Sequence, residues 1–225
     1  AAALNLAAEL PAGRAAGVKQ LGIETNPDIR AAVVAMLGRT GDEAGKTAVL
    51  AALADPELVV RQAAAQASLV FGAEGMEALL AYASQAGSAE DAKAAQDALL
   101  QVREADLTAR VGALLPAASS TGKVVMLAVL AARNASDQST VALAEMTSPD
   151  REVAKAALAA LEIIGRSRDV PAVLEFFSAT DSSASRNGAR SVLVAICRRD
   201  GTALAPVLAA QAAAEEMAKP RQAGP

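Results

Sequence analysis

Two stretches of this chain repeat one pattern: Asp55-Pro56-Glu57-Leu58-Val59-Val60-Arg61-Gln62-Ala63-Ala64 and Ser148-Pro149-Asp150-Arg151-Glu152-Val153-Ala154-Lys155-Ala156-Ala157. Pro56 and Pro149 are 93 residues apart, which is three times 31. A repeat of this length indicates units that cannot bury their own apolar face and must stack on their neighbours. We therefore predict an all-α fold, an α-α superhelix (α-solenoid) of six to seven helix pairs with no sheet.

Six positions mark the starts of the repeats at spacings of 31 or 32 residues: Ile29, Val60, Asp91, Gly122, Val153 and Ser185. The residues 4, 7 and 8 positions after each start are mostly Ala, Val, Leu and Met, and these offsets trace one face of a helix. A second apolar stretch follows each of these helices, at 48–53, 76–82, 107–115, 141–146, 170–177 and 204–213. Each unit is therefore predicted to be helix, tight turn, helix.

Residues typical of helix ends support these boundaries. Three segments, Asn26-Pro27-Asp28, Asp55-Pro56-Glu57 and Ser148-Pro149-Asp150, each offer an N-cap side chain, a Pro at the first helical position and an acid facing the helix dipole. Twelve residues after three of the starts stand Gly41, Gly72 and Gly165, which predict left-handed C-caps. The unit starting at Gly122 lacks both signals, and we expect a bend or a more enclosed helix there.

The order Asp-Pro, Val-Arg, Ala-Ala, Leu and Gly at this period resembles the short HEAT repeats, including the HEAT-like repeats named for phycobilisome lyases. The resemblance covers about residues 26–200. It implies one array over 1–225, with a capping helix pair at 1–25, repeats at 26–200, a closing helix at 201–219 and a tail at 220–225. Arg30 and Arg61 are expected to pair with turn carboxylates of adjacent units, with Asp42 and Asp55 available.

Composition limits the classes of function. The net charge of −4 is spread unevenly, −5 over residues 1–100 and +1 over 101–225, and it argues against a nucleic-acid polycation. The single Cys197 excludes an internal disulfide and a Cys-ligated metal site. No run reaches the roughly 18 apolar residues of a membrane span, so we expect a soluble chain. A start at Ala1 without Met fits a segment of a larger bacterial protein or a mature chain after signal removal, and leaves cytoplasmic and exported locations open.

The sequence contains no complete catalytic motif. The chain has no His, which removes the commonest general base and metal ligand. Residues 41–47 are one residue short of a phosphate-binding P-loop, and 120–123 match Ser-x-x-Lys without the accompanying motifs. The carboxylate pairs at 42–43 and 215–216 are expected to be solvated. We predict no catalytic residue, cofactor or metal, and HEAT-type di-iron hydroxylases, which are similar in fold, depend on His-Glu pairs absent here.

The leading hypothesis is a non-enzymatic scaffold, expected to be monomeric, whose concave face binds another protein or a neighbouring domain. The side chains predicted to line that face lie two and six positions after the repeat starts: Gln62, Gln66, Lys93, Asp97, Lys155, Asn187 and Ser191. They are small, polar and of mixed charge. The four aromatic residues, Phe71, Tyr82, Phe176 and Phe177, are expected to pack in the core.

Two alternatives remain open. The first is an enzyme or enzyme subunit similar to the bilin lyases. The second is phosphate or nucleic-acid binding through a cluster of four cations without an acid among them: Arg186, Arg190, Arg198 and Arg199. HEAT-like alkylpurine DNA glycosylases also use a basic face, but they rely on aromatic residues as well, and this chain has no Trp. The same cluster could instead face an acidic protein.

Overall fold

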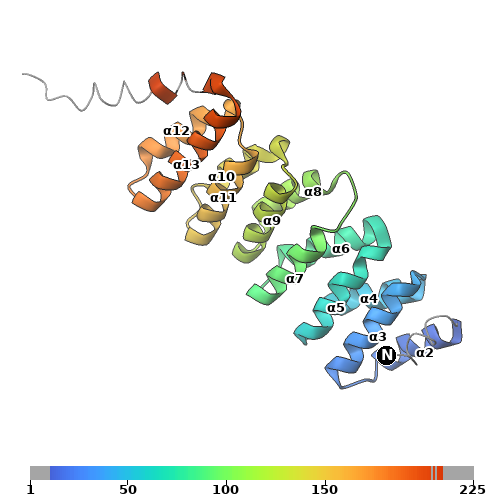
Figure 1. The fold of residues 1–225 in the computed structure, drawn as a ribbon. Helices are drawn as coiled ribbons and strands as arrows, with labels where there is room; N and C mark the ends of the chain where they lie inside the picture. Colours follow the sequence, from blue (N-terminus) through green and yellow to red (C-terminus); the bar gives the residue numbers. More distant parts are fainter. Residues whose placement is uncertain (1–10, 204, 206, 210–225) are drawn as a thin grey trace, which may run out of the picture. The chain divides into compact units, whose positions relative to one another are not determined.

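The structure is a computed structural model that describes residues 11–203, 205 and 207–209. Over these residues the chain is α-helical with short 3₁₀ turns and contains no strand, which confirms the all-α prediction (Figure 1). The α-helices are α2 (Pro11–Leu21), α3 (Pro27–Thr40), α4 (Glu43–Ala51), α5 (Leu58–Ser68), α6 (Gly72–Ser84), α7 (Ala89–Leu99), α8 (Leu107–Leu114), α9 (Ser120–Ala132), α10 (Ser139–Glu145), α11 (Arg151–Ile164), α12 (Val170–Ala179) and α13 (Ser183–Arg199). None of the helices in this part of the chain has the length and apolar character that a bilayer crossing needs.

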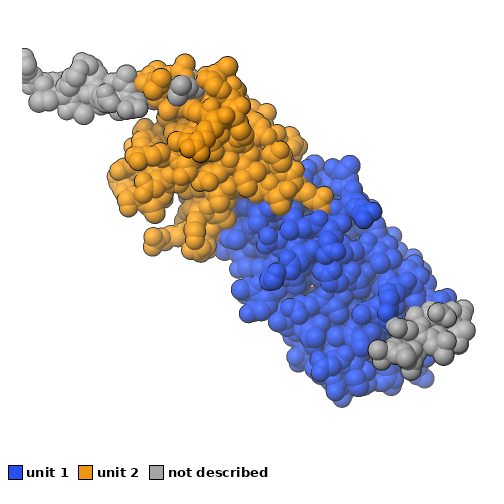
Figure 2. Space-filling view, viewed as in Figure 1, with its two compact units in different colours: residues 1–129 blue, residues 130–225 orange. Residues whose placement is uncertain are grey.

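The chain divides into two compact units, residues 1–129 and 130–225 (Figure 2). In the first unit, α3 packs against α5 and α5 against α7; in the second, α11 packs against α13. We call α3, α5, α7, α9, α11 and α13 the first helices of their repeats. The described residues hold five complete pairs, α3/α4 to α11/α12, with α2 before them and α13 after. Part of the predicted capping pair (1–10) and most of the closing helix and tail lie outside the described residues.

The core follows the repeat. Val60 and Val153 are buried at the starts of their units, whereas Ile29 is 43% exposed. The positions 4, 7 and 8 after the starts are all at most 8% exposed: Val33, Ala64, Ala95, Met126, Ala157 and Ala189; Met36, Ala67, Ala98, Val129, Ala160 and Val192; Leu37, Ser68, Leu99, Leu130, Leu161 and Leu193. Ala is the commonest residue in the first two of these rows, which lets neighbouring first helices within each unit approach closely. The predicted period is confirmed.

Only one of the three predicted Pro-containing starts has the expected form. Asn26 caps α3, accepting from the N–H groups of Asp28 and Ile29, with Pro27 as the first helical residue. The other two predictions are wrong by two residues. The Asp55 carboxylate is held by Arg30 and by the N–H of Glu57, so α5 begins at 58. In α11 the N-cap is Asp150, which leaves the preceding Pro outside the helix.

The predicted left-handed caps are also only partly confirmed. Gly41 has φ 65° and ψ 14° at the end of α3, as expected. Gly72 has a positive φ of 52° but a ψ of −129°, outside the left-handed helical region. Gly165 is extended, with φ −60° and ψ 147°, so that prediction is wrong. Glycine is needed there for a different reason, because a Cβ would lie 2.6 Å from the carbonyl oxygen of Leu161.

The enclosed helix expected near Gly122 is present. In α9 the residues at 125, 126, 127, 129 and 130 are at most 2% exposed. The expectation that the aromatic residues are core is wrong, because all four are only half-buried. The side chain of Tyr82 is only partly buried because its hydroxyl donates a hydrogen bond to the carboxylate of Asp91 at 2.6 Å. This polar contact orients the Tyr82 ring.

Candidate functional site

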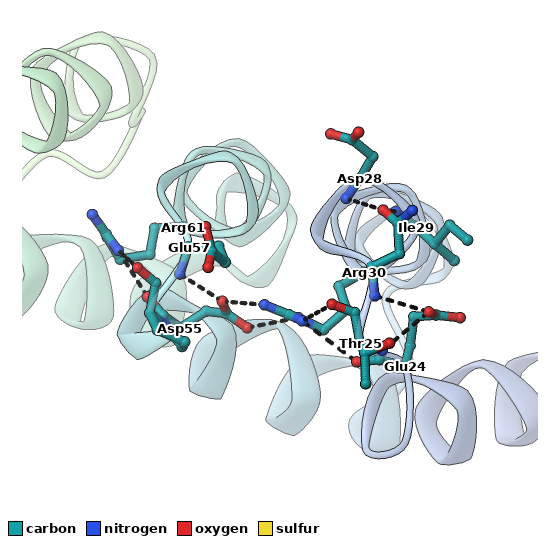
Figure 3. Close-up of polar contacts among 10 residues, drawn as sticks. Glu24, Thr25, Asp28, Ile29, Arg30, Asp55, Glu57 and Arg61 are labelled. Carbon is teal, nitrogen blue, oxygen red and sulfur yellow. Dashed lines mark hydrogen bonds and ion pairs between the residues drawn. The ribbon is translucent and has the colours of Figure 1, made fainter.

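Arginine residues just after the starts of the repeats connect consecutive layers of the first unit. Arg30 of α3 donates from Nε and Nη2 to the two carboxylate oxygens of Asp55, at 3.1 and 2.9 Å. Its Nη1 also donates to the carbonyl oxygens of Thr25 and Glu24 in the preceding turn (Figure 3). Burial opposes ionisation of Asp55, but Arg30 and the N–H of Glu57 hold the pKa of this carboxyl below its ordinary value. The predicted pairing of Arg30 with Asp55 is confirmed.

Arg61 makes the equivalent contact one repeat later, with a carboxylate that the sequence did not suggest. It donates from Nε and Nη2 to Asp91 at 2.8 and 3.0 Å, and from Nη1 to the carbonyl oxygens of Asp55 and Pro56, both at 2.8 Å. Asp42, the other carboxylate offered by the sequence, pairs instead with Arg14 at 2.7 Å. Asp91 is adjacent to Arg61 because α5 and α7 pack side by side.

Asp91 is the most heavily hydrogen-bonded carboxylate of the first unit. Besides Arg61 it accepts from the hydroxyls of Tyr82 and Ser88, at 2.6 and 2.8 Å, and it is 8% exposed. The Arg61 bonds lower the pKa of Asp91 to about 2 against the opposing effect of burial. Burial and the neighbouring carboxylate raise the pKa of Tyr82. Neither group exchanges a proton near neutral pH, so the cluster holds helices together and is unsuited to acid–base chemistry.

The seven side chains predicted to contact a partner are all exposed on first helices. In the first unit Gln62 and Gln66 lie on α5 and Lys93 and Asp97 on α7. Lys93 pairs with Asp97 at 2.8 Å. Gln101, which sequence reasoning did not single out, joins the two helices by donating to Gln66 at 3.2 Å. In the second unit Lys155 lies on α11, and Asn187 and Ser191 lie on α13. We call each of these sets the polar face of its unit.

A groove of about 1100 Å³ runs between α11 and α13 in the second unit. Lys155 lines it with Arg151, Glu152 and Glu162, while its α13 wall is made of small residues at 184, 185 and 188. A Cβ on Gly188 would lie 2.7 Å from Cδ1 of Leu158, so the missing side chain lets α13 lie close to α11. Sequence reasoning missed this groove, although the run of small residues opening α13 was a visible signal.

The four arginines of the predicted basic cluster have two different environments. Arg186 donates to the carbonyl oxygen of Thr180 at 2.6 Å, and Arg199 donates to the carbonyl oxygens of Glu162 and Ile163 at the end of α11. Burial and the nearby Arg166 lower the pKa of Arg199. Arg190 and Arg198 are exposed, and neither has an ion pair or hydrogen bond within the part of the chain that the structure describes. Of the four arginines of the cluster, these two present unoccupied guanidinium groups to solvent.

Among the described residues there is no group of three or more acidic or Cys side chains placed to hold a metal ion. The groups that combine burial with strong pKa shifts, Asp91 and Tyr82, are those already bound to one another. The chemistry that this surface offers is therefore hydrogen bonding and charge pairing by exposed side chains.

No protein-family model and no curated protein matches this chain. Among solved structures it is similar to an engineered protein, at 18% identity and a TM-score of 0.46, over 80% of this chain and 96% of that one. It is also similar to the complex of CpcE and CpcF of phycocyanin lyase from Nostoc sp. PCC7120, at 17% identity and a TM-score of 0.40, over 87% of this chain and 78% of that one. At these values neither neighbour assigns a family or an activity.

Proposed function

We propose that this protein is a non-catalytic scaffold that binds another protein, or a neighbouring domain of its own polypeptide, through the polar faces of its units. One observation carries the proposal. In the first helices of both units the rows at offsets 4, 7 and 8 are buried, while the predicted contact residues are all exposed. The first helices therefore offer a surface of side chains that the fold itself does not need for its core.

The chemistry of this surface suits protein recognition. Gln and Asn side chains offer both a donor and an acceptor, and Lys and Asp add charge of both signs. Such mixed polar groups resemble the rim of a protein interface more than the apolar lining of a small-molecule site. The groove between α11 and α13 adds a concave element, with Arg151, Glu152 and Lys155 along one wall.

The interlayer ion pairs support a binding role as well. Arg30 and Arg61 fix α3, α5 and α7 relative to one another through bidentate bonds. A surface held in place before the partner arrives loses less conformational entropy on binding. The two groups with large pKa shifts, Asp91 and Tyr82, belong to the cluster around Arg61, which favours a scaffold over a catalyst.

The test is a double charge reversal on the polar faces, Lys93→Glu with Lys155→Glu. Each Lys makes only an exposed ion pair, so the melting temperature should stay close to that of the unchanged protein. Capture of a partner from an extract of the source cells, followed by mass spectrometry and titration of the identified partner, should show weaker binding by about tenfold.

A matched control reverses two exposed cations that lie outside the first helices, Lys19→Glu on α2 with Arg103→Glu in the turn after α7. This variant should retain full partner affinity. Equal binding by the Lys93/Lys155 variant and the control would show that the polar faces are not the docking surface.

A further inference from the structure

We propose that the exposed side of α13 binds an acidic segment of another protein that carries an apolar side chain between its carboxylates. This inference rests on the proposed scaffold function and names the chemistry of its partner. The surface begins with five residues that share one side of α13 at helical spacing: Asn187, Arg190, Ser191, Val194 and Arg198. All five are exposed. Helix α13 therefore carries members of both predicted sets, the seven polar contact residues and the four arginines of the basic cluster.

The surface has an apolar centre. Val194 lies midway between Arg190 and Arg198 on the same side of α13 and is 43% exposed. An exposed β-branched side chain between two cations gives a partner an apolar anchor of the kind found at the centre of interfaces.

The charge around this centre is predominantly positive. Arg190 and Arg198 are exposed and unpaired within the described residues, and Arg166 and Arg199 add two guanidinium groups whose donors bind carbonyl oxygens. The acids close by are Glu162 and Asp200, and the carboxylate of Asp200 already accepts from Ser167 and Thr202. The 17 residues of α13 contain no acid. An acidic partner therefore matches this surface, whereas a basic one would be repelled.

The spacing of the charges restricts the partner further. Arg190 and Arg198 are eight residues apart, which is about 12 Å along a helix, with Val194 midway between them. A complementary segment has carboxylates separated by a similar distance and an apolar side chain between them. A nucleic acid fits less well, because Val194 lies between the two cations and residues 130–225 carry eleven basic and eleven acidic side chains.

The experiment uses the full chain and three labelled probes at about 0.15 M salt, where weak long-range attraction is screened. The first probe is a 14-residue designed peptide with Glu residues eight positions apart and Leu between them. The second has Gln in place of each Glu, and the third is a short DNA duplex. Fluorescence anisotropy should show binding of the acidic peptide, with about tenfold weaker binding of the Gln peptide and of DNA.

Arg190→Glu with Arg198→Glu should weaken binding of the acidic peptide by about tenfold. Val194→Ser should weaken the binding of both peptides by a similar factor. Lys19→Glu with Arg103→Glu, equal in charge change, should leave it unaltered. Unchanged melting temperatures establish that the variants are folded. Equal binding of the Glu and Gln peptides, indifference to the Arg190/Arg198 variant, or preference for DNA would each overturn the inference.

The same variants separate this inference from the proposed function. If the captured partner loses affinity with Lys93→Glu and Lys155→Glu but not with the Arg190/Arg198 variant, the scaffold function stands and the acidic-segment inference fails. If neither double variant alters partner binding, both fail.

Discussion

At the scale of single residues, Asp91 joins three parts of the first unit. Its carboxylate receives Arg61 from α5, Tyr82 from α6 and Ser88 from the turn before α7. Because the pKa of Asp91 is lowered from 3.8 to about 2, ionisation of this group stabilises the folded state. The stabilisation is complete above pH 3.8 and is lost as the pH falls through 2.

Asp91→Asn should therefore destabilise the protein by about 2–3 kcal/mol at pH 7, because it removes the charge that balances the largely buried Arg61. The loss relative to the unchanged protein should shrink between pH 4 and pH 2, where the native carboxylate itself becomes protonated. Urea unfolding at several pH values measures both effects. The exposed pair offers a control, since Asp97→Asn should cost less than about 1 kcal/mol. A pH-independent difference for Asp91→Asn would contradict this account.

Gly38 tests the close packing of first helices. A Cβ at this position would lie 2.9 Å from the Cα of Ala67 on α5, with no flexible side chain to move aside. Although Ala favours helix over Gly, Gly38→Ala should destabilise the fold by about 1–3 kcal/mol. Gly87→Ala is the matched control, because nothing lies within 4 Å of its added Cβ. Chemical denaturation of the two variants should separate them clearly; equal stability would show that α3 and α5 can move apart without cost.

At the scale of helices, the start of α3 depends on the side chain of Asn26, while Glu57 at the start of α5 makes no such bond. Asn26→Ala should cost about 1 kcal/mol, and Glu57→Ala should change stability by less than about 0.5 kcal/mol. Thermal unfolding of the two variants compares them directly. A larger loss from Glu57→Ala would mean that the cap geometry does not control these ends.

The helix scale also explains which features the sequence could predict. Burial at offsets 4, 7 and 8 could be predicted because it depends only on the 3.6-residue period of a helix. The spacing of apolar residues in the sequence shows this period directly. The partner of Arg61 depends on how α7 packs on α5, and this brings together residues 30 apart. Gly165 was misjudged because its role comes from close backbone packing against Leu161, and composition cannot distinguish that from a left-handed cap.

The candidate site was predictable to the same extent. Exposure of the seven polar residues follows from the period, so their positions on the helix surface could be given. The groove could not, because it depends on side chains from two helices meeting. The four arginines looked alike in the sequence, yet Arg186 and Arg199 turn to backbone carbonyl oxygens and Arg190 and Arg198 do not.

At the scale of the whole molecule, stacked repeats contact mainly their neighbours, so a local defect should stay local. Asp91→Asn should raise amide hydrogen exchange in α5, α6 and α7, which share its contacts, and leave α11 and α13 at their original rates. Hydrogen exchange followed by mass spectrometry resolves these segments. A uniform increase along the chain would indicate that the protein unfolds as a single cooperative block.

Asp55 accepts Arg30 on its side chain and Arg61 on its backbone oxygen. The repeat that starts at Val60 thus makes with its successor the same kind of bond that it receives from its predecessor. A gene duplication copying this 31-residue segment would create one new junction, at which an arginine and a carboxylate are again available. Growth or shortening of the protein during evolution by whole repeats is accordingly compatible with this bonding scheme, whereas insertions of other lengths would separate each arginine from its acceptor.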